Sequence, residues 1–269
     1  MQSIASLCKN IVEEDSAIFP RVTLSTPSIR QLGMEDLLTN QAFSFCKREL
    51  HTWVFSYSEL FDVPALQDSL SALEIERAAL FSTKELSSRY TYARGLLRTV
   101  LSRYVGVAPE HVSFEYSSLG KPYINNRSLH FNLSHSEDVV FLVISEEFEL
   151  GADVEKVRCV PEGTSIAERW FTKQEAEWIC SSDHNTRESA AFLRCWVIRE
   201  AFVKAVGFGL MLPLNSFGVL LPEFTITEAT LTNTPMSPTI TKHERSDDVL
   251  IIELTPQNGY CAAIAVLTV

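Results

Sequence analysis

Residues 129–157, LHFNLSHSEDVVFLVISEEFELGADVEKV, hold three short runs rich in β-forming residues, with charged or turn-forming residues between them. Runs of this length with such breaks are typical of neighbouring strands joined by tight turns. The stretch before them has a different period. Between residues 82 and 106 apolar residues recur at helical spacing, and Gly106 is placed to end the helix. This order predicts an antiparallel meander packed against a long helix.

The second half of the chain repeats this order of elements. Helical patterns cover residues 172–180 and 187–207. A helix followed by an antiparallel meander, twice, indicates an α+β protein of two similar halves, with a natural ligand site in the cleft between them. We place the halves at residues 51–155 and 156–269, after an N-terminal extension, residues 1–50, to which the sequence assigns no role. The strand candidates after the second long helix are residues 217–221, 224–231, 248–254 and 260–269.

The composition of the chain limits the classes of molecule that it is expected to bind. The formal net charge of the 269 residues is −11, whereas a general nucleic-acid binder would carry an excess of basic residues. No apolar stretch approaches the roughly 18 residues of a membrane span, and the N-terminus lacks the apolar core of a signal peptide. The six cysteines form no CxxC pair and no zinc-like spacing, which indicates free thiols. We expect a soluble cytoplasmic protein without nucleic-acid or membrane partners.

Two carboxylates stand two residues apart in GADVEK, at Asp153 and Glu155. On a strand this spacing places both side chains on one face. Like charges so close raise each other's pKa unless a cation lies between them, and Mg²⁺ prefers oxygen ligands of this kind. The alternative is an exposed edge strand with outward-facing acids.

A second charged set lies within WVIREAFVKAVG, residues 196–207. Trp196, Glu200 and Lys204 follow each other at intervals of four, so one helical face carries a ring, a carboxylate and an ammonium group. The alternative is a solvated ion pair of small effect on an exposed helix.

A third set combines Lys121 of GKP with Ser134 and His135 of FNLSHS. Cationic and small hydrogen-bonding groups near one strand end suit a phosphate and a nucleotide base. A structural or merely solvated histidine is the alternative. Glu175 also has two readings, because Thr172 and Glu175 have the spacing of a helix capping box.

The chain resembles the Sfp-type 4'-phosphopantetheinyl transferases from about residue 71 to residue 214. The resemblance implies the family's fold of two pseudo-symmetric α+β halves. It also implies the family's reaction, in which the phosphopantetheine arm of coenzyme A moves to a serine of an apo carrier protein, with release of 3',5'-ADP and a requirement for Mg²⁺. Five motifs carry it in this order: GKP (120–122), FNLSHS (131–136), GADVE (151–155), FTKQE (171–175) and WVIREAFVKAVG (196–207).

Metal-binding and catalytic roles follow from the same resemblance. Asp153, Glu155 and Glu200 would bind Mg²⁺, and Glu175 would lie near the metal. Glu200 would also act as the base toward the carrier serine, directly or through a metal-bound water. Lys204 would meet the pyrophosphate and stabilise the departing ADP phosphate.

The resemblance also assigns five contacts with coenzyme A: Arg89, Lys121, Ser134, His135 and Lys204. Arg89 and His135 would share the 3'-phosphate. Arg199 departs from the family's pattern, in which this position is usually Lys. Arginine keeps the positive charge but offers a different geometry of hydrogen-bond donors.

Two other functions use the same residues. A Mg²⁺-dependent phosphodiesterase would employ the carboxylates with a different acceptor, and a non-catalytic module would only bind carrier proteins or coenzyme A. With both halves in one chain we expect a monomer. The carrier partner can belong to a fatty acid, polyketide, nonribosomal peptide or polyunsaturated fatty acid synthase.

Overall fold

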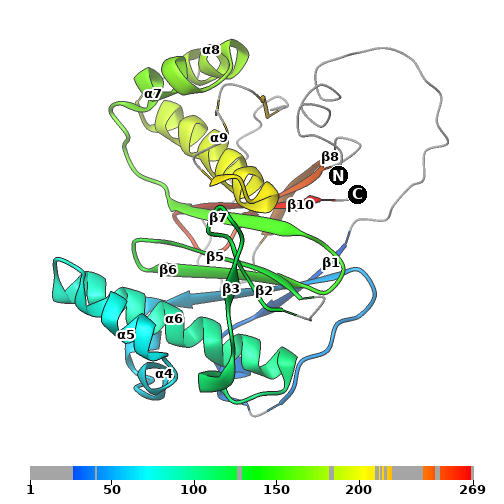
Figure 1. Ribbon diagram of the computed structural model, residues 1–269. Helices are drawn as coiled ribbons and strands as arrows, with labels where there is room; N and C mark the ends of the chain where they lie inside the picture. Colours follow the sequence, from blue (N-terminus) through cyan, green and yellow to red (C-terminus); the bar gives the residue numbers. More distant parts are fainter. Residues whose placement is uncertain are drawn as a thin grey trace.

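The computed structural model of the protein describes residues 27–39, 41–125, 129–181, 185–209, 212, 214, 217–219, 239–245 and 249–267. Two four-stranded sheets form its centre, and a 22-residue helix packs on the outer face of each (Figure 1). The predicted α+β class is therefore confirmed. The strand candidate at residues 224–231 lies outside the described residues, as does the end of the candidate before it.

The first sheet has the strand order β1-β2-β6-β5. β1 runs parallel to β2, while the pairs β2–β6 and β6–β5 are antiparallel. This parallel edge differs from the expected antiparallel sheet, because the chain passes from β1 to β2 by a crossover through α2 rather than by a tight hairpin. The strands are β1 (Ser28–Leu32), β2 (Glu49–Ser56), β5 (His130–Ser136) and β6 (Val139–Ser145).

The second sheet has the order β7-β10-β9-β8 and is antiparallel throughout. β7 belongs to it although β7 follows β6 directly in the sequence. The backbone of β7 pairs with β10 and not with β6, and the division of the chain into halves at residue 155 stays a prediction. The strands are β7 (Leu150–Lys156), β8 (Thr239–Arg245), β9 (Val249–Thr255) and β10 (Tyr260–Leu267).

Two long helices, α6 (Lys84–Val105) and α9 (Asn185–Val206), accompany the sheets. Thr83 caps the start of α6, and Gly106 ends it with φ of +71° while its N–H bonds the Ser102 carbonyl, as predicted. No helix of the described chain is long and apolar enough to cross a bilayer. The shorter elements are α2 (Met34–Leu38), α3 (Tyr57–Phe61), α4 (Ala65–Asp68), α5 (Ala72–Ala79), the 3-10 helix η1 (Pro109–His111), β3 (Glu115–Tyr116), β4 (Pro122–Tyr123), α7 (Gly163–Trp170) and α8 (Lys173–Ser181).

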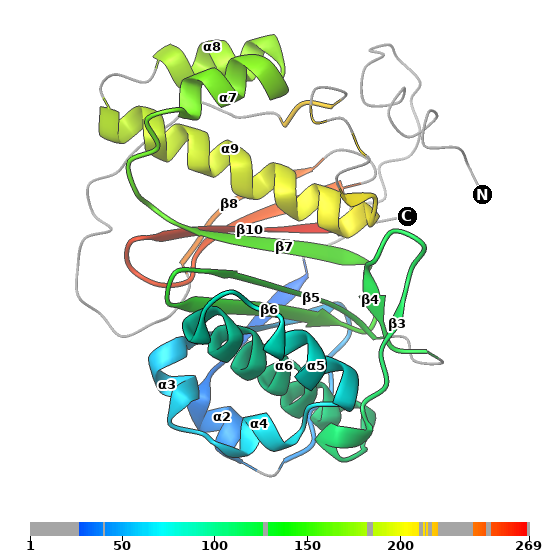
Figure 2. The same ribbon diagram turned by 60° about the vertical axis from the view of Figure 1, so that its left-hand side comes forward.

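The sheets pack face to face, so four layers follow one another: α6, the first sheet, the second sheet and α9 (Figure 2). β6 is buried on both faces, which explains its continuous apolar run. Its residues alternate between two clusters: Val139, Phe141 and Val143 pack toward the second sheet, and Val140, Leu142 and Ile144 pack toward α6.

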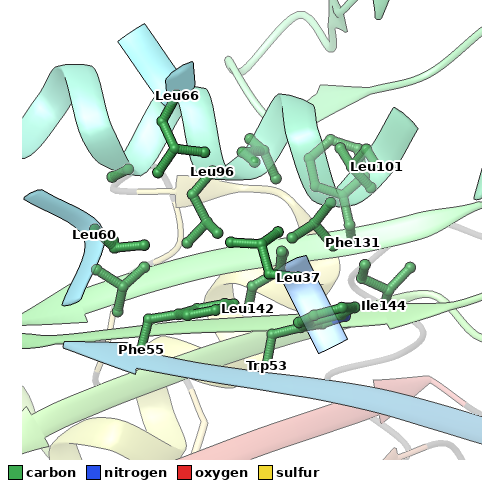
Figure 3. Packing of buried hydrophobic residues seen from close by; sticks show 14 of the residues in the cluster. Leu37, Trp53, Phe55, Leu60, Leu66, Leu96, Leu101, Phe131, Leu142 and Ile144 are labelled. Atoms are coloured by element: carbon green, nitrogen blue, oxygen red, sulfur yellow. The ribbon is translucent and has the colours of Figure 1, made fainter. Parts of the chain in front are cut away.

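The core beneath α6 joins distant parts of the first half. Figure 3 shows Leu96 and Leu101 of α6 above Trp53 and Phe55 of β2. All four are fully or almost fully buried, and burying one such side chain contributes about 1.5–3 kcal/mol. Leu32 of β1 and Leu37 of α2 belong to this cluster. Residues 28–39 and 41–50, to which the sequence assigned no role, thus extend the first sheet and its core.

Candidate active site

β5 and β7 are edge strands of different sheets, and they lie side by side (Figure 2). Side chains of β5 satisfy backbone groups of the β7 edge. The Asn132 side-chain oxygen accepts the Ala152 N–H at 2.8 Å, and the Ser136 hydroxyl accepts the Lys156 N–H at 3.1 Å. Ser134 has the same orientation because side chains alternate along a strand. The polar residues of FNLSHS therefore form the contact between the two sheets.

Asp153 occupies the centre of this junction and is only 5% exposed. Ser134 donates its hydroxyl to Asp153 Oδ1 at 2.8 Å, and Lys204 Nζ lies 2.5 Å from the same oxygen. Lys204 extends from α9 and also donates to the Ser134 hydroxyl, at 3.2 Å, and to the Ala152 carbonyl, at 3.3 Å. Three layers of the fold meet in this one hydrogen-bonded group.

The other carboxylate oxygen of Asp153, Oδ2, is buried and has no hydrogen-bond partner among the described residues. Burial raises the pKa of Asp153, and the Lys204 ammonium and the Ser134 hydroxyl only partly offset this. Leaving a buried acceptor unsatisfied costs about 1–3 kcal/mol. A divalent cation that takes oxygen ligands would remove this cost, so the chemistry of Asp153 fits a metal ion.

Glu155 and Glu200 bring two further carboxylates near Asp153. Glu155 follows two residues later on the same face of β7, and Glu200 lies on α9 one turn before Lys204. Burial raises the pKa of Glu200; the charges of Asp153 and Glu155 raise it further, while Lys204 opposes them. Glu200 therefore lies within electrostatic reach of both carboxylates of β7.

These carboxylates do not form a finished metal centre. No three acidic, histidine or cysteine side chains within the described residues are gathered closely enough to hold an ion. The cation beside Asp153 is the ammonium group of Lys204. Asp153 Oδ2 is the oxygen that a metal ion can take without displacing Lys204.

Arg89 and His135 both pack against Tyr57 at one end of β5. The Arg89 guanidinium lies 5.1 Å from the Tyr57 ring centroid, and the His135 ring packs edge-on at 6.3 Å. Arg89 also donates to the Glu137 carbonyl in the turn after β5. Partial desolvation of the imidazole lowers the pKa of His135, and the positive charges of Lys204 and Arg89 lower it further. The structure thus brings together the two residues that the resemblance assigned to one phosphate.

Lys121 lies elsewhere, at the junction of β7 with the end of α9. Its ammonium group donates to the Ala205 carbonyl at 2.7 Å and to the Leu150 carbonyl at 3.2 Å. Burial lowers its pKa. Its side chain lines a cavity of about 360 Å³ together with His130 and Glu149. Both acceptors of Lys121 are backbone oxygens, so it joins β7 to α9.

Arg199, which the sequence left without a definite role, is 1% exposed and forms an ion pair with Glu175. Its guanidinium lies 4.4 Å from the Phe171 ring centroid and 4.7 Å from that of Phe217. It also donates to the carbonyl of Phe217, at 3.0 Å, and to that of Leu214. Arg199 therefore links α9 to Leu214 and Phe217, which follow the helix in the chain.

Glu175 completes this buried cluster. Its Oε2 accepts the Thr172 N–H at 2.9 Å, and its Oε1 accepts the Val219 N–H at 2.8 Å. The Glu175 N–H returns a bond to the Thr172 hydroxyl at 3.4 Å, so the predicted capping box is confirmed. None of these contacts reaches the three carboxylates described above. A place for Glu175 near the metal stays a prediction.

Gly151 determines how closely α9 approaches β7. A Cβ atom at Gly151 would lie 2.1 Å from the Ala201 carbonyl oxygen and 2.2 Å from the Ala205 nitrogen. Only glycine permits this contact. The close approach brings Lys204 within reach of Asp153.

Sequence reasoning missed several residues around the site. Ser136 and Asn132 contact β7, and their alternation with apolar residues in FNLSHS was a usable signal. Arg158 lies 2.8 Å from Glu155, and Tyr57 contacts both Arg89 and His135. Nothing in the local pattern around Tyr57 or Arg158 marks either residue.

The known proteins to which the chain is similar in sequence include several enzymes named as phosphopantetheinyl transferases. The model of the 4'-phosphopantetheinyl transferase superfamily matches residues 149–265, which include β7 and α9. The chain is 32% identical over 226 residues to 4'-phosphopantetheinyl transferase HetI of Nostoc sp., covering 81% of this chain and 87% of that protein. It is 33% identical over 149 residues to 4'-phosphopantetheinyl transferase Sfp of Bacillus subtilis, covering 55% and 65% respectively. It is also 29% identical over 170 residues to the L-aminoadipate-semialdehyde dehydrogenase-phosphopantetheinyl transferase of Mus musculus, covering 59% and 54%.

Proposed function

The chain belongs to the 4'-phosphopantetheinyl transferase superfamily, and we propose that the junction of β5, β7 and α9 is its active site. There it transfers the 4'-phosphopantetheine group of coenzyme A to a serine of an apo carrier protein and releases 3',5'-ADP. The observation that carries the proposal is the buried Oδ2 of Asp153, without a partner among the described residues, beside Lys204, Glu155 and Glu200. Opposite charges gathered in this way suit phosphoryl transfer, which depends on positioning and electrostatic stabilisation.

We assign Mg²⁺ to Asp153, Glu155 and Glu200. When bound, it would neutralise charge on the pyrophosphate of coenzyme A. The raised pKa values of Asp153 and Glu200 support this assignment, because burial and like charges disfavour the ionised carboxylates. A divalent cation would restore the ionised form of both.

Glu200 is the proposed base. It takes the proton of the carrier serine while the serine oxygen forms a bond to the β-phosphorus of coenzyme A. The bond from this phosphorus to the bridging oxygen breaks, and 3',5'-ADP leaves with the electron pair. A positioned base contributes roughly 10²- to 10⁴-fold, most effectively when its pKa is near the working pH. Burial raises the pKa of Glu200 in the metal-free protein, and bound Mg²⁺ would lower it again and keep the carboxylate ionised to accept the proton.

Lys204 is the proposed phosphate contact on the leaving side. Its ammonium group bonds Asp153 and the Ser134 hydroxyl, and its side chain is 29% exposed. A phosphate oxygen arriving from solvent can therefore reach it. Because α9 holds Glu200 one turn away, the base and this cation keep a fixed separation along the helix.

Coenzyme A is proposed to lie between these groups and the end of β5. Arg89 and His135 would bind its 3'-phosphate, and the anion would raise the lowered pKa of His135. Ser134 and Lys121 are the further proposed contacts. Since the Lys121 ammonium already bonds two carbonyls, its contact with coenzyme A would come from its stem or backbone, or require a different rotamer.

We further propose that the protein acts as a monomer in the cytoplasm, with no nucleic-acid or membrane partner. Carrier proteins are acidic and this chain has a net charge of −11. Recognition must therefore rest on a local basic or apolar patch.

The decisive experiment incubates the protein with coenzyme A, Mg²⁺ and an apo carrier protein, and then weighs the carrier. A transferase adds the mass of one phosphopantetheine group, and a carrier with alanine in place of the acceptor serine gains nothing. A phosphodiesterase releases 3',5'-ADP without changing the carrier, and a binding module does neither. Either of the last two results would overturn the proposed function.

A further inference from the structure

Ser136 stands in the same relation to Glu155 as Ser134 does to Asp153. Both serines lie on β5 two residues apart, and both acids lie on β7 two residues apart. The Ser136 hydroxyl donates to Glu155 Oε2 at 2.8 Å, the distance that also separates Ser134 Oγ from Asp153 Oδ1. The resemblance to known enzymes assigned a role to Ser134 and none to Ser136.

The hydroxyl of Ser136 has only one possible orientation here. Ser136 is 9% exposed, and its oxygen accepts the backbone N–H of Lys156 at 3.1 Å. A hydroxyl has one proton, and a backbone N–H can only donate. The proton of Ser136 is therefore directed at Glu155, and the bond cannot reverse.

Glu155 has one other restraint among the described residues, and it is weaker. Arg158 NH1 lies 2.8 Å from the same oxygen, Oε2, but the Arg158 side chain is 47% exposed. An exposed pair of this kind holds a carboxylate loosely and is screened by salt. Ser136 is thus the buried group that fixes the Glu155 carboxylate, and it does so through Oε2.

We infer that Ser136 is a positioning residue that orients Glu155 for the metal ion, an inference that rests on the proposed function. With Oε2 engaged by Ser136 and Arg158, Oε1 is the oxygen presented to the cation. Hydrogen bonds of this kind around a metal ligand typically affect metal affinity by 10- to 100-fold. Ser136 acts through Glu155 and does not touch the reacting atoms.

The test is the binding of Mn²⁺, followed by its paramagnetic resonance, to the full chain with and without coenzyme A. Ser136→Ala should weaken Mn²⁺ binding by roughly tenfold or more. Ser136→Thr, which retains the hydroxyl, should restore most of the affinity. Ser145→Ala is the matched control, because this buried strand serine accepts the backbone N–H groups of Glu147 and Phe148 and contacts no carboxylate in the described part of the chain.

Transfer kinetics add a second readout. In Ser136→Ala the Mg²⁺ concentration for half-maximal transfer should rise by a similar factor, while the rate at saturating Mg²⁺ recovers. A general folding defect would instead lower the rate at every Mg²⁺ concentration, which would count against the inference. If Ser136→Ala does not fold, Ser136→Cys, whose thiol is a larger group and a much weaker hydrogen-bond donor, replaces it in both assays.

The outcomes separate the inference from the proposed function. Normal Mn²⁺ affinity in Ser136→Ala, with a wild-type protein that binds Mn²⁺ and transfers the group, would overturn the role of Ser136 alone. A wild-type protein that neither binds Mn²⁺ nor modifies the carrier would overturn the proposed function, and the inference with it.

Discussion

Lys204 Nζ lies 2.5 Å from Asp153 Oδ1, although the two residues are 51 positions apart. The Lys204 side chain is 29% exposed, whereas that of Asp153 is 7% exposed. The ammonium group therefore compensates a carboxylate that water hardly reaches. The same group is proposed to bind a substrate phosphate, so Lys204 links the stability of the junction to its chemistry.

Lys204→Met should lower the free energy of unfolding by about 2 kcal/mol in the absence of metal. The loss is smaller than the 3–5 kcal/mol of a fully buried pair because Lys204 is partly exposed. Mg²⁺ should restore more stability to this variant than it adds to the wild type, since a cation then replaces the missing charge. Urea denaturation with and without Mg²⁺ measures both effects.

The control for this prediction is Lys173→Met, which breaks an exposed pair with Glu177 at 3.6 Å and should change little. Wild-type stability of Lys204→Met without Mg²⁺ would contradict the compensating role of Lys204.

Glu200→Gln should reduce the transfer rate by about 10²- to 10⁴-fold and leave the melting temperature nearly unchanged. The wild-type rate should fall as the pH drops through the pKa of Glu200, because the base must be ionised. Burial raises this pKa in the metal-free protein, whereas bound Mg²⁺ would oppose that shift, so the acidic limb should move to lower pH as the Mg²⁺ concentration rises. Rates measured across pH on Glu200→Gln should lack this limb. The exposed Glu177→Gln variant serves as control, and full activity in Glu200→Gln would refute the assignment.

Arg199→Lys should destabilise the fold by about 2 kcal/mol, because an ammonium group cannot reproduce the planar stacking and multiple donors of Arg199. The transfer rate per folded molecule should remain within about twofold, since every described contact of Arg199 is structural. Chemical denaturation and initial rates measure the two quantities. A large loss of rate without a loss of stability would instead indicate a substrate contact.

Gly151→Ala should destabilise the protein by about 3 kcal/mol or more and lower transfer as well. The added methyl group meets backbone atoms of α9 at 2.1 and 2.2 Å, so α9 must move away from β7 and carry Lys204 with it. Gly33→Ala is a suitable control, because its nearest contact would be at 3.9 Å. Equal stability of the two variants would show that the approach of α9 tolerates adjustment.

Glu74 provides a pH prediction away from the active site. Burial alone would raise its pKa, but bonds from Arg98, the Ser71 backbone and Arg94 lower it below 4.5. A lowered acid pKa contributes stability above the unfolded value, and this stability is lost as the pH falls through the folded value. Wild-type stability should therefore decline below about pH 4.5. Glu74→Gln should cost about 3 kcal/mol at neutral pH and show a smaller decline.

Unfolding measured between pH 7 and pH 3 checks this, with the exposed Glu76→Gln on the same helix as control. Parallel curves for the wild type and Glu74→Gln would exclude Glu74 as the source of the acid sensitivity.

Several features of the site follow from short-range pattern. The end of α6 at Gly106 and the capping box of Thr172 and Glu175 were predicted from residues within one turn of each other. The placement of Asp153 and Glu155 on one face of β7 needed only the two-residue period of a strand. These features depend on local backbone geometry, which neighbouring residues largely determine.

Other features have no local cause. The pattern of β7 is equally compatible with pairing to β6, so the order of strands depended on β10, more than a hundred residues later. Arg199 has the sequence context of a charged helix residue, yet it is buried because Phe171, Phe217 and Glu175 surround it.

Sequence pattern alone was enough to predict the two long helices, the shared face of Asp153 and Glu155 on β7, and the charged residues proposed to carry the chemistry. The contact of Lys204 with Asp153, the contact of Ser136 with Glu155 and the burial of Arg199 became visible only once the layers were packed together. The physical reason is that periodicity and capping are satisfied within a few residues. Contacts between β5, β7 and α9 instead depend on how whole layers pack and on a glycine small enough to let them meet.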